Sequence, residues 1–239
     1  MRRMGFVVVI SLLALSLLAC TGQEQGALSA EDEAKAQQLL QAYDRARLDG
    51  NWEAALVQGE RLRSKYPDSP AARTLRASYD DTLTKADAAV EKRRLGALWT
   101  YQSLAVEGGR QYTAQIDSRV EANPDDDTTP APDARLVLRI HPDWGHSSYL
   151  LLNQKQFECG TPCTMQIKFD EAALQTFAGK QADSGQGPAL FIEDQQAFHA
   201  AMSQAKIVRI VLPKTGSYTP PTLVFEVAGY DRSQLGAQF

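Results

Sequence analysis

Near its middle the chain reads Leu136-Val137-Leu138-Arg139-Ile140-His141. Leu136, Leu138 and Ile140 recur at every second position, so their side chains share one face of an extended strand. Arg139 and His141 belong to the opposite face. This alternation is typical of an antiparallel sheet with one buried face, and it predicts a strand at 136–141.

The same period of two returns twice further along the chain. Its apolar positions are Met165, Ile167, Phe169, Leu223, Phe225 and Val227. Two short helices are expected, at Asp170–Phe177 and at about Asp194–Ala205, and the acid-rich stretch 121–133 predicts a solvated loop. Residues 97–239 are therefore predicted to form an α+β domain, β-sandwich-like, with half-buried antiparallel strands.

Residues 31–95 have a helical period instead. Leu39, Leu40, Tyr43 and Ala46 recur at helical spacing, and two further helices are expected after Asn51 and after Ser69. Ser29 and Ser69 are expected as N-caps, with Pro70 at a first helical position. The fold class predicted is α+β, with a helical hairpin and a third helix before the β-rich domain.

Gly50-Asn51-Trp52-Glu53-Ala54-Ala55, followed by Pro67 and Ala77, resembles a tetratricopeptide (TPR) repeat. The resemblance covers about residues 36–80, just over one repeat, whereas at least three normally make a self-sufficient solenoid. It implies that the hairpin leans on the rest of the chain or on a partner. The candidate partner-binding side chains are Tyr43, Trp52 and Tyr79. An ordinary helical hairpin without a binding role is the alternative.

The N-terminus has the pattern of a secretory signal over residues 1–19. Arg2 and Arg3 precede an apolar stretch that is too short to span a membrane comfortably. Leu17-Leu18-Ala19-Cys20 resembles the lipobox of bacterial lipoproteins. The resemblance implies acylation of Cys20, for example with palmitate, a tether at 20–30, and the periplasmic side of the outer membrane. A plain signal with a chance cysteine is the alternative.

The second segment resembles a family of secreted Gram-negative domains that has no assigned function. The residues that carry the likeness are Trp99-Thr100-Tyr101, Leu138–Pro142, Gln156–Cys159, Cys163–Asp170, Ala189–Asp194 and Phe225–Gly229. The likeness spans most of residues 97–231. It implies an α+β fold and an envelope location, and it supplies no catalytic residue.

Two cysteines remain once Cys20 carries lipid. Cys159 and Cys163 are close in sequence, and an oxidising periplasm favours their pairing. We expect a disulfide that pins the turn before the strand at Met165. A redox role is the alternative, but such motifs usually have Cys-x-x-Cys at the start of a helix.

The segment His141-Pro142-Asp143-Trp144-Gly145-His146 gathers two imidazoles and a carboxylate. An envelope enzyme or a metal-binding protein using His141, Asp143 and His146 is therefore one hypothesis. Proline and glycine also make the segment a strand-end turn with polar caps, and further ligands are not evident. No metal and no cofactor are expected.

The charge balance argues against nucleic acid as a partner. The 239 residues carry 25 Lys+Arg and 29 Asp+Glu, a net charge of −4, whereas bulk nucleic-acid binders have a basic excess. Phosphate-cradling, zinc-protease and dinucleotide motifs are also missing from the sequence. The function predicted is a non-enzymatic binding or scaffold module of the cell envelope, lipid-anchored and with an envelope protein as partner.

Overall fold

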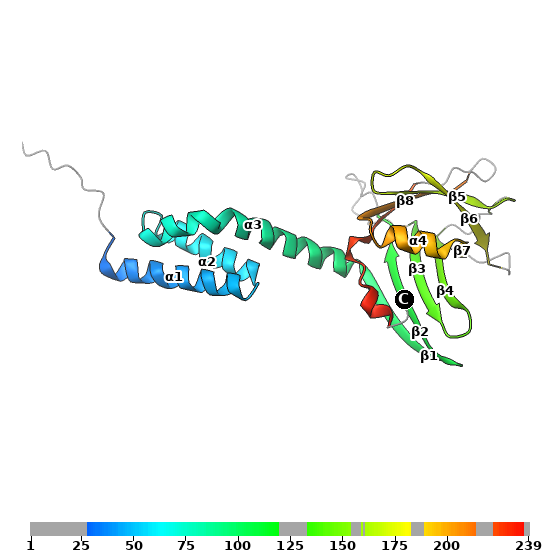
Figure 1. Ribbon diagram of the computed structural model, residues 1–239, viewed down its shortest axis with the longest axis horizontal. Coiled ribbons are helices and arrows are strands. Elements are labelled where there is room, and N and C mark those ends of the chain that lie inside the picture. Colours follow the sequence, from blue (N-terminus) through cyan, green and yellow to red (C-terminus); the bar gives the residue numbers. More distant parts are fainter. Residues whose placement is uncertain are drawn as a thin grey trace, which may run out of the picture. The chain divides into compact units, whose positions relative to one another are not determined.

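The computed structural model describes residues 28–119, 133–153, 159, 161–182, 189–213 and 222–236. Helices come first and a β-rich domain follows, which confirms the predicted α+β class (Figure 1). The chain divides into two compact units, one up to Asp80 and one from Asp81 onward. The predicted signal peptide, Cys20 and most of the stretch 121–133 lie outside the described residues.

The helices are α1 (Ala30–Leu48), α2 (Trp52–Lys65), α3 (Pro70–Ala97), α4 (Gln195–Met202) and the short η1 (Val227–Gly229) and η2 (Arg232–Leu235). The strands are β1 (Trp99–Val106), β2 (Gly109–Asp117), β3 (Ala134–His141), β4 (Gly145–Leu152), β5 (Thr164–Phe169), β6 (Gln175–Gln181), β7 (Ala189–Ile192), β8 (Ile207–Val211) and β9 (Leu223–Glu226). In the part of the chain that is described, no helix has both the length and the apolar character needed to cross a bilayer.

Side-chain caps begin the helices where the sequence predicts them. Ser29 Oγ accepts a hydrogen bond from the backbone N–H of Asp32 over 3.1 Å. Ser69 Oγ accepts one from Ala72 over 3.0 Å, and Pro70 follows as the first residue of α3. Each cap satisfies an N–H group that the first helical turn leaves without an intrahelical partner.

The helical unit packs around two tyrosines. Tyr43 is fully buried, and its hydroxyl lies 3.0 Å from Ser78 Oγ. Tyr79 is also buried, and its hydroxyl donates to Glu60. Gly59 in α2 lies against both rings, since a Cβ there would be 3.3 Å from ring carbons of each tyrosine. The neighbouring core residues include Leu40, Leu62 and Leu75.

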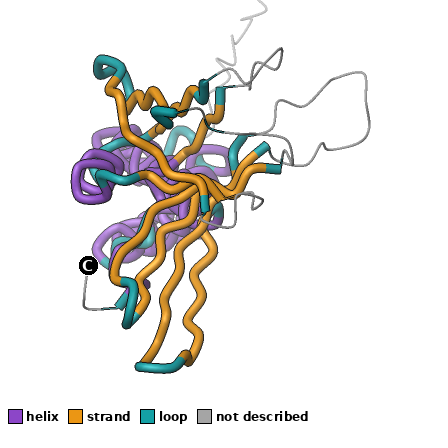
Figure 2. The backbone as a smooth tube through the Cα atoms, turned by 90° about the vertical axis from the view of Figure 1, so that its right-hand side faces the viewer, coloured by secondary structure: helices purple, strands orange, loops and turns teal. Residues whose placement is uncertain are grey.

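Hydrogen bonds join the described strands in the order β1-β2-β3-β4-β7-β6-β5-β8-β9, and every neighbouring pair is antiparallel. Figure 2 shows how strongly these strands twist across the domain. The backbone N–H of Arg119, just beyond β2, donates to the carbonyl of Val224 in β9 over 2.7 Å. This contact brings the chain after β2 close to β9, although six strands separate β2 from β9 in the strand order.

One apolar core takes side chains from every strand. The alternation predicted at 136–141 is confirmed, because its three apolar positions are buried in this core and Arg139 points to the other face. The same holds for Met165–Phe169 and for Leu223–Val227. Period-two patterning thus decided which face of the sheet is buried.

The helix predicted at Asp170–Phe177 is wrong. Asp170 takes a φ of 48°, the chain turns, and β6 then begins at Gln175. Inside β6, Phe177 and Gly179 are both buried, as alternate residues of a strand are. A Cβ at Gly179 would lie 2.8 Å from Met165 Cε and 2.9 Å from Cys163 Sγ, so these two side chains would have to shift to admit one.

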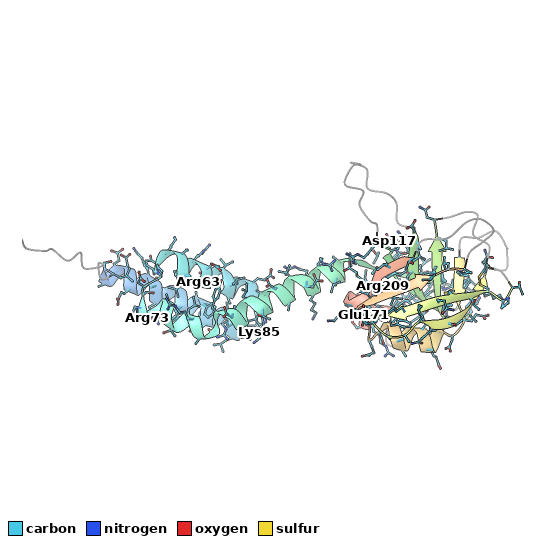
Figure 3. The ribbon with its side chains drawn as sticks, turned by 90° about the horizontal axis from the view of Figure 1, so that it is seen from above. Arg63, Arg73, Lys85, Asp117, Glu171 and Arg209 are labelled. Carbon is cyan, nitrogen blue, oxygen red and sulfur yellow. A yellow bond between two sulfur atoms is a disulfide. The ribbon has the colours of Figure 1, made fainter. Side chains whose placement is uncertain are left out.

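Contacts with β8 fix the turn that replaces this helix. The carboxylate of Asp170 accepts hydrogen bonds from the backbone N–H groups of Lys206 and Ile207, at 2.9 and 2.8 Å. Glu171 lies beside Arg209 in Figure 3, and the two form an ion pair of 3.9 Å. The backbone contacts hold the turn, because an exposed ion pair of this kind contributes little.

The helix predicted at about Asp194–Ala205 is confirmed as α4. The side chain of Asp194 caps it by accepting from the backbone N–H of Ala197 over 3.1 Å. Phe198 is fully buried, with its ring centroid 5.9 Å from that of Phe169 and 6.1 Å from that of Phe177. This aromatic contact attaches α4 to the core.

The C-terminal end of α3 contacts the last residue of β9 and the residues that follow it. Arg94 pairs with Glu226 over 3.0 Å. Gly229 lies against the helix so tightly that a Cβ on it would be 2.2 Å from the carbonyl carbon of Leu95. Backbone therefore meets backbone here, with no room for a side chain.

Candidate functional site

The β3–β4 hairpin presents different side chains on its two faces. Ile140 pairs with His146, and both belong to the core-facing side of the hairpin. Arg139 pairs with Ser147, and Tyr149 follows two residues later on the same outward side. The hairpin thus separates an outward polar and aromatic surface from the interior.

Arg139 is held on the outward face by two rings and a hydroxyl. Its guanidinium carbon lies 5.1 Å from the ring centroid of Trp144 and 5.4 Å from that of Tyr149. Its Nε donates to Ser147 Oγ over 2.9 Å. Its Nη nitrogens make no hydrogen bond or ion pair with any residue that the structure describes. The cation is fixed by cation–π contacts, and its far edge remains available for a ligand.

Trp144 is exposed and nevertheless fixed. Its side chain is 67% exposed, in the turn between the two strands. Its ring stacks on the imidazole of His141, with centroids 3.9 Å apart and an interplanar angle of 14°. His141 is itself buried, and its Nδ1 accepts from the backbone N–H of Asp143 over 3.1 Å. A fixed aromatic face in contact with solvent is a common recognition element.

A pocket of about 580 Å³ opens beside this arginine–tryptophan pair. Phe191 from β7 and Lys180 from β6 line it further, and the register places Phe191 between Tyr149 and Lys180. The ring centroids of Tyr149 and Phe191 are 5.0 Å apart. Among the described lining residues, two cations face one carboxylate, that of Glu193. The pocket therefore suits an anionic ligand with a flat apolar part.

Neutral polar groups lie in the pocket and beside it, where Tyr149 contacts the lining residue Phe191. Burial raises the pKa of the Tyr149 hydroxyl, although the neighbouring Arg139 opposes this shift. The phenol therefore keeps its proton at neutral pH. Gln195 also lines the pocket, and its Oε1 is buried without a hydrogen-bond partner in the described part of the chain. Buried acceptors without a partner destabilise a fold, and a donor on a ligand relieves that.

The predicted pairing of Cys159 with Cys163 is confirmed by a disulfide with Cα atoms 5.1 Å apart. The backbone N–H of Cys159 donates to Oε1 of Gln181, a residue of the pocket wall, over 3.0 Å. The carbonyl of Cys163 accepts from the N–H of Gly179 over 2.9 Å. The disulfide loop is thus fastened to β6 at one side of the pocket.

The hypothetical catalytic or metal-binding turn is not brought together. His146 pairs with Ile140, the residue just before His141. Because successive residues of a strand point to opposite faces, His141 lies on the outward face of the hairpin and His146 on the core-facing side. Asp143 meets His141 through its backbone N–H rather than through its carboxylate. Within the described ranges, no three His, Cys, Asp or Glu side chains are grouped so that they could hold a metal ion.

Two of the three partner-binding candidates lie inside the helical core. Tyr43 is fully buried against Gly59, which corrects the expectation for that residue. Tyr79 packs against the same glycine and is 6% exposed, and it lines a pocket with Arg63 and Arg76. The helical spacing of these tyrosines is the spacing of residues on the buried face of a helix, and a buried ring has little surface left to contact a partner. Trp52 is half-buried at the start of α2. Cys20 lies outside the described residues.

Sequence reasoning did not identify the pocket residues. The alternation predicts the outward position of Arg139 correctly. A tryptophan in a polar turn, as at Trp144, is a sequence signal for an exposed aromatic binding surface. Phe191 and Lys180 could not have been found, because they reach the site only through the pairing of β4 with β7 and of β7 with β6. Cross-strand neighbours distant in sequence leave no trace in local periodicity.

The sequence matches no protein-family model and no curated protein. Among solved structures, the chain is similar to invasion associated protein B from Bartonella henselae, with 15% sequence identity and a TM-score of 0.37. The similarity covers 55% of this chain and 85% of that one. A similarity of this size assigns neither an activity nor a residue role to the chain.

Proposed function

We propose that this protein is a lipoprotein of the outer membrane, facing the periplasm, and that it acts as a non-enzymatic binding module. In this proposal the β-rich domain binds an acidic glycan of the cell envelope in the pocket beside Arg139 and Trp144. The observation that carries the proposal is the immobilised guanidinium of Arg139, which lies between two aromatic rings with its Nη edge unoccupied by described residues.

The fixed guanidinium of Arg139 indicates that the ligand is an anion. Guanidinium groups pair with carboxylates through two parallel hydrogen bonds, and a fixed guanidinium loses little side-chain entropy on binding. Lys180 is the second cationic side chain among the described residues that line the pocket. The net charge of the chain is −4, so a pocket with a local excess of cations is a departure from its surroundings.

The aromatic and amide side chains of the pocket favour a sugar as the ligand. The exposed ring of Trp144 offers a flat apolar face, on which the C–H groups of a sugar ring can stack. The side-chain amides of Gln181 and Gln195 line the pocket and offer hydrogen bonds to hydroxyl groups. A uronic acid has a carboxylate, hydroxyls and an apolar ring face at once, and we propose it as the ligand class.

The N-terminal sequence supports a lipid anchor in the membrane. The basic start, the apolar stretch and Leu17-Leu18-Ala19-Cys20 support acylation of Cys20. The TPR-like segment supports a second role for the helical unit, contact with an envelope protein, for which Trp52 remains the candidate residue. Neither role requires catalysis.

Calorimetric titration of the mature protein with oligogalacturonate of defined length tests the proposal. The control ligands are a neutral oligosaccharide of the same length and linear polyglutamate. We expect measurable binding of oligogalacturonate alone, and binding about tenfold weaker in Arg139→Gln and in Trp144→Ala.

Two exposed residues of the same domain serve as control sites. Arg110 and Leu104 lie in β2 and β1, away from the pocket lining, and Arg110→Gln and Leu104→Ala should bind like the parent protein. Equal binding of the neutral oligosaccharide, or unchanged binding in Arg139→Gln, would overturn the assignment of the site.

A further inference from the structure

A second pocket lies on the core-facing side of the same hairpin. It has a volume of about 870 Å³. His146 and Ser148 line it from β4, His199 from α4 and Arg232 from η2, with amide and hydroxyl side chains of α4 between them. This pocket therefore collects nitrogen and hydroxyl donors from three separate elements.

The lining of this pocket contains no acid among the described residues. Acidic residues nevertheless outnumber basic ones in the chain as a whole. The two nearest carboxylates in sequence are engaged elsewhere: Asp194 caps α4, and Asp231 accepts from the N–H and hydroxyl of Ser233 at 3.0 and 2.6 Å.

The cationic and imidazole groups are close enough to influence one another. His199 Nε2 lies 3.1 Å from the hydroxyl of Tyr230, and the two rings meet edge to face. Burial lowers the pKa of His199 to about 4, and the charges of Arg232 and His146 act in the same direction. These two residues therefore direct positive potential toward the space beside His199. Such potential disfavours a further proton and favours an anion.

We infer that this pocket binds a phosphate group, with Arg232 pairing with its oxygens and with His146 and Ser148 as hydrogen-bond donors. Donors that approach from three elements fit a tetrahedral oxyanion better than a planar carboxylate, which a single guanidinium fork satisfies. The pocket is much larger than one phosphate ion, so the ligand is a phosphate ester with a polar organic part. That part would meet the amides of Gln196 and Gln204. This pocket shares Gln195 with the glycan pocket and otherwise has a lining of its own, and the inference does not rest on the proposed function.

Titration of the mature protein with glycerol 3-phosphate, followed by NMR of the histidine side chains, tests the inference. Inorganic phosphate is the second probe, and glycerol and sodium chloride at matched ionic strength are the controls. We expect saturable shifts of the His146 and His199 signals with both phosphate probes, and none of His141, which lies on the other face of the hairpin.

The variants Arg232→Gln and His146→Asn both change exposed side chains, so each should leave the core packing intact. We expect Arg232→Gln to weaken glycerol 3-phosphate binding about tenfold or more, while Arg110→Gln has no effect. Unaltered affinity in both Arg232→Gln and His146→Asn, or equal shifts with sodium chloride, would overturn the inference. Binding of inorganic phosphate without glycerol 3-phosphate would refute the ester and leave only a small-anion site.

Discussion

The imidazoles of His141 and His146 lie on opposite faces of one hairpin, although the two residues are close neighbours in the sequence. His141 supports Trp144 on the outward face, and His146 lines the pocket beneath α4. We predict that His141→Ala weakens oligogalacturonate binding alone and that His146→Asn weakens phosphate binding alone. The double variant should show additive effects within about 0.5 kcal/mol, measured by calorimetry with both ligands. Strong coupling between the two would contradict the separation.

Removing the disulfide should destabilise the β-rich domain. The closed loop is short, and the chain-entropy model gives a loss of about 2 kcal/mol in the free energy of unfolding for Cys159→Ser with Cys163→Ser. Urea unfolding of the variant, and of the parent protein with reductant, should agree. Because Cys159 also holds Gln181, glycan affinity should fall as well. A variant as stable as the parent would show that the native turn forms without the covalent bond.

Stability should fall on acidification through the range set by His199. Its pKa is about 4 in the fold and 6.5 by default, so the unfolded chain takes up a proton between these values and the folded chain does not. The contribution of His199 is therefore fully present above pH 6.5 and is lost as the pH falls toward 4. Thermal unfolding at pH 7 and pH 5 should show a smaller loss of Tm in His199→Asn than in the parent. Equal losses would mean that burial, with the charges of Arg232 and His146, does not hold the imidazole neutral.

Tyr43 should act as a packing residue of the helical unit. Tyr43→Phe removes the hydroxyl contact with Ser78 and should cost about 1 kcal/mol of unfolding free energy. Tyr43→Ala leaves a cavity and should cost about 3–5 kcal/mol. Helical circular dichroism during denaturant titration measures both. The exposed neighbour Val57→Ala should change little, and a near-neutral Tyr43→Ala would return this residue to the list of surface candidates.

Acylation of Cys20 should determine whether the protein sediments with membranes. In the proposed lipoprotein, Cys20→Ser removes the thiol that is acylated, so the variant should carry no palmitate label and should be absent from the outer membrane. Metabolic labelling with palmitate, followed by separation of inner and outer membranes, gives the readout. Label retained by Cys20→Ser would place the lipid on another residue.

The sequence anticipates those parts of the fold that depend on local patterning. The faces of 136–141, the cap at Ser69 and the helix near Phe198 follow from period and from capping chemistry. The helix predicted after Asp170 is wrong because the conformation of this segment depends on contacts with residues 206–209, in and just before β8. Tertiary contacts override the weak helical preference of a few residues.

The candidate sites were less predictable than the fold. Cys159 and Cys163 could be paired because the loop between them is short. The pocket beside Arg139 needs Phe191 from a strand that joins β4 only through the sheet order, and the pocket beside His146 needs Arg232 from near the C-terminus. Binding sites assembled from distant segments require the strand order first, and periodicity does not supply it.

The backbone contact between Gly229 and Leu95 has a practical consequence for anyone who isolates the β-rich domain. A fragment that begins at Trp99, where the sequence changes period, would discard Leu95 and Arg94 and expose the surface they cover. A fragment that begins near Asp81 would keep them. In evolution, too, the last turns of α3 must be inherited with the strands, and any exchange of helical segments between genes has to join upstream of this point.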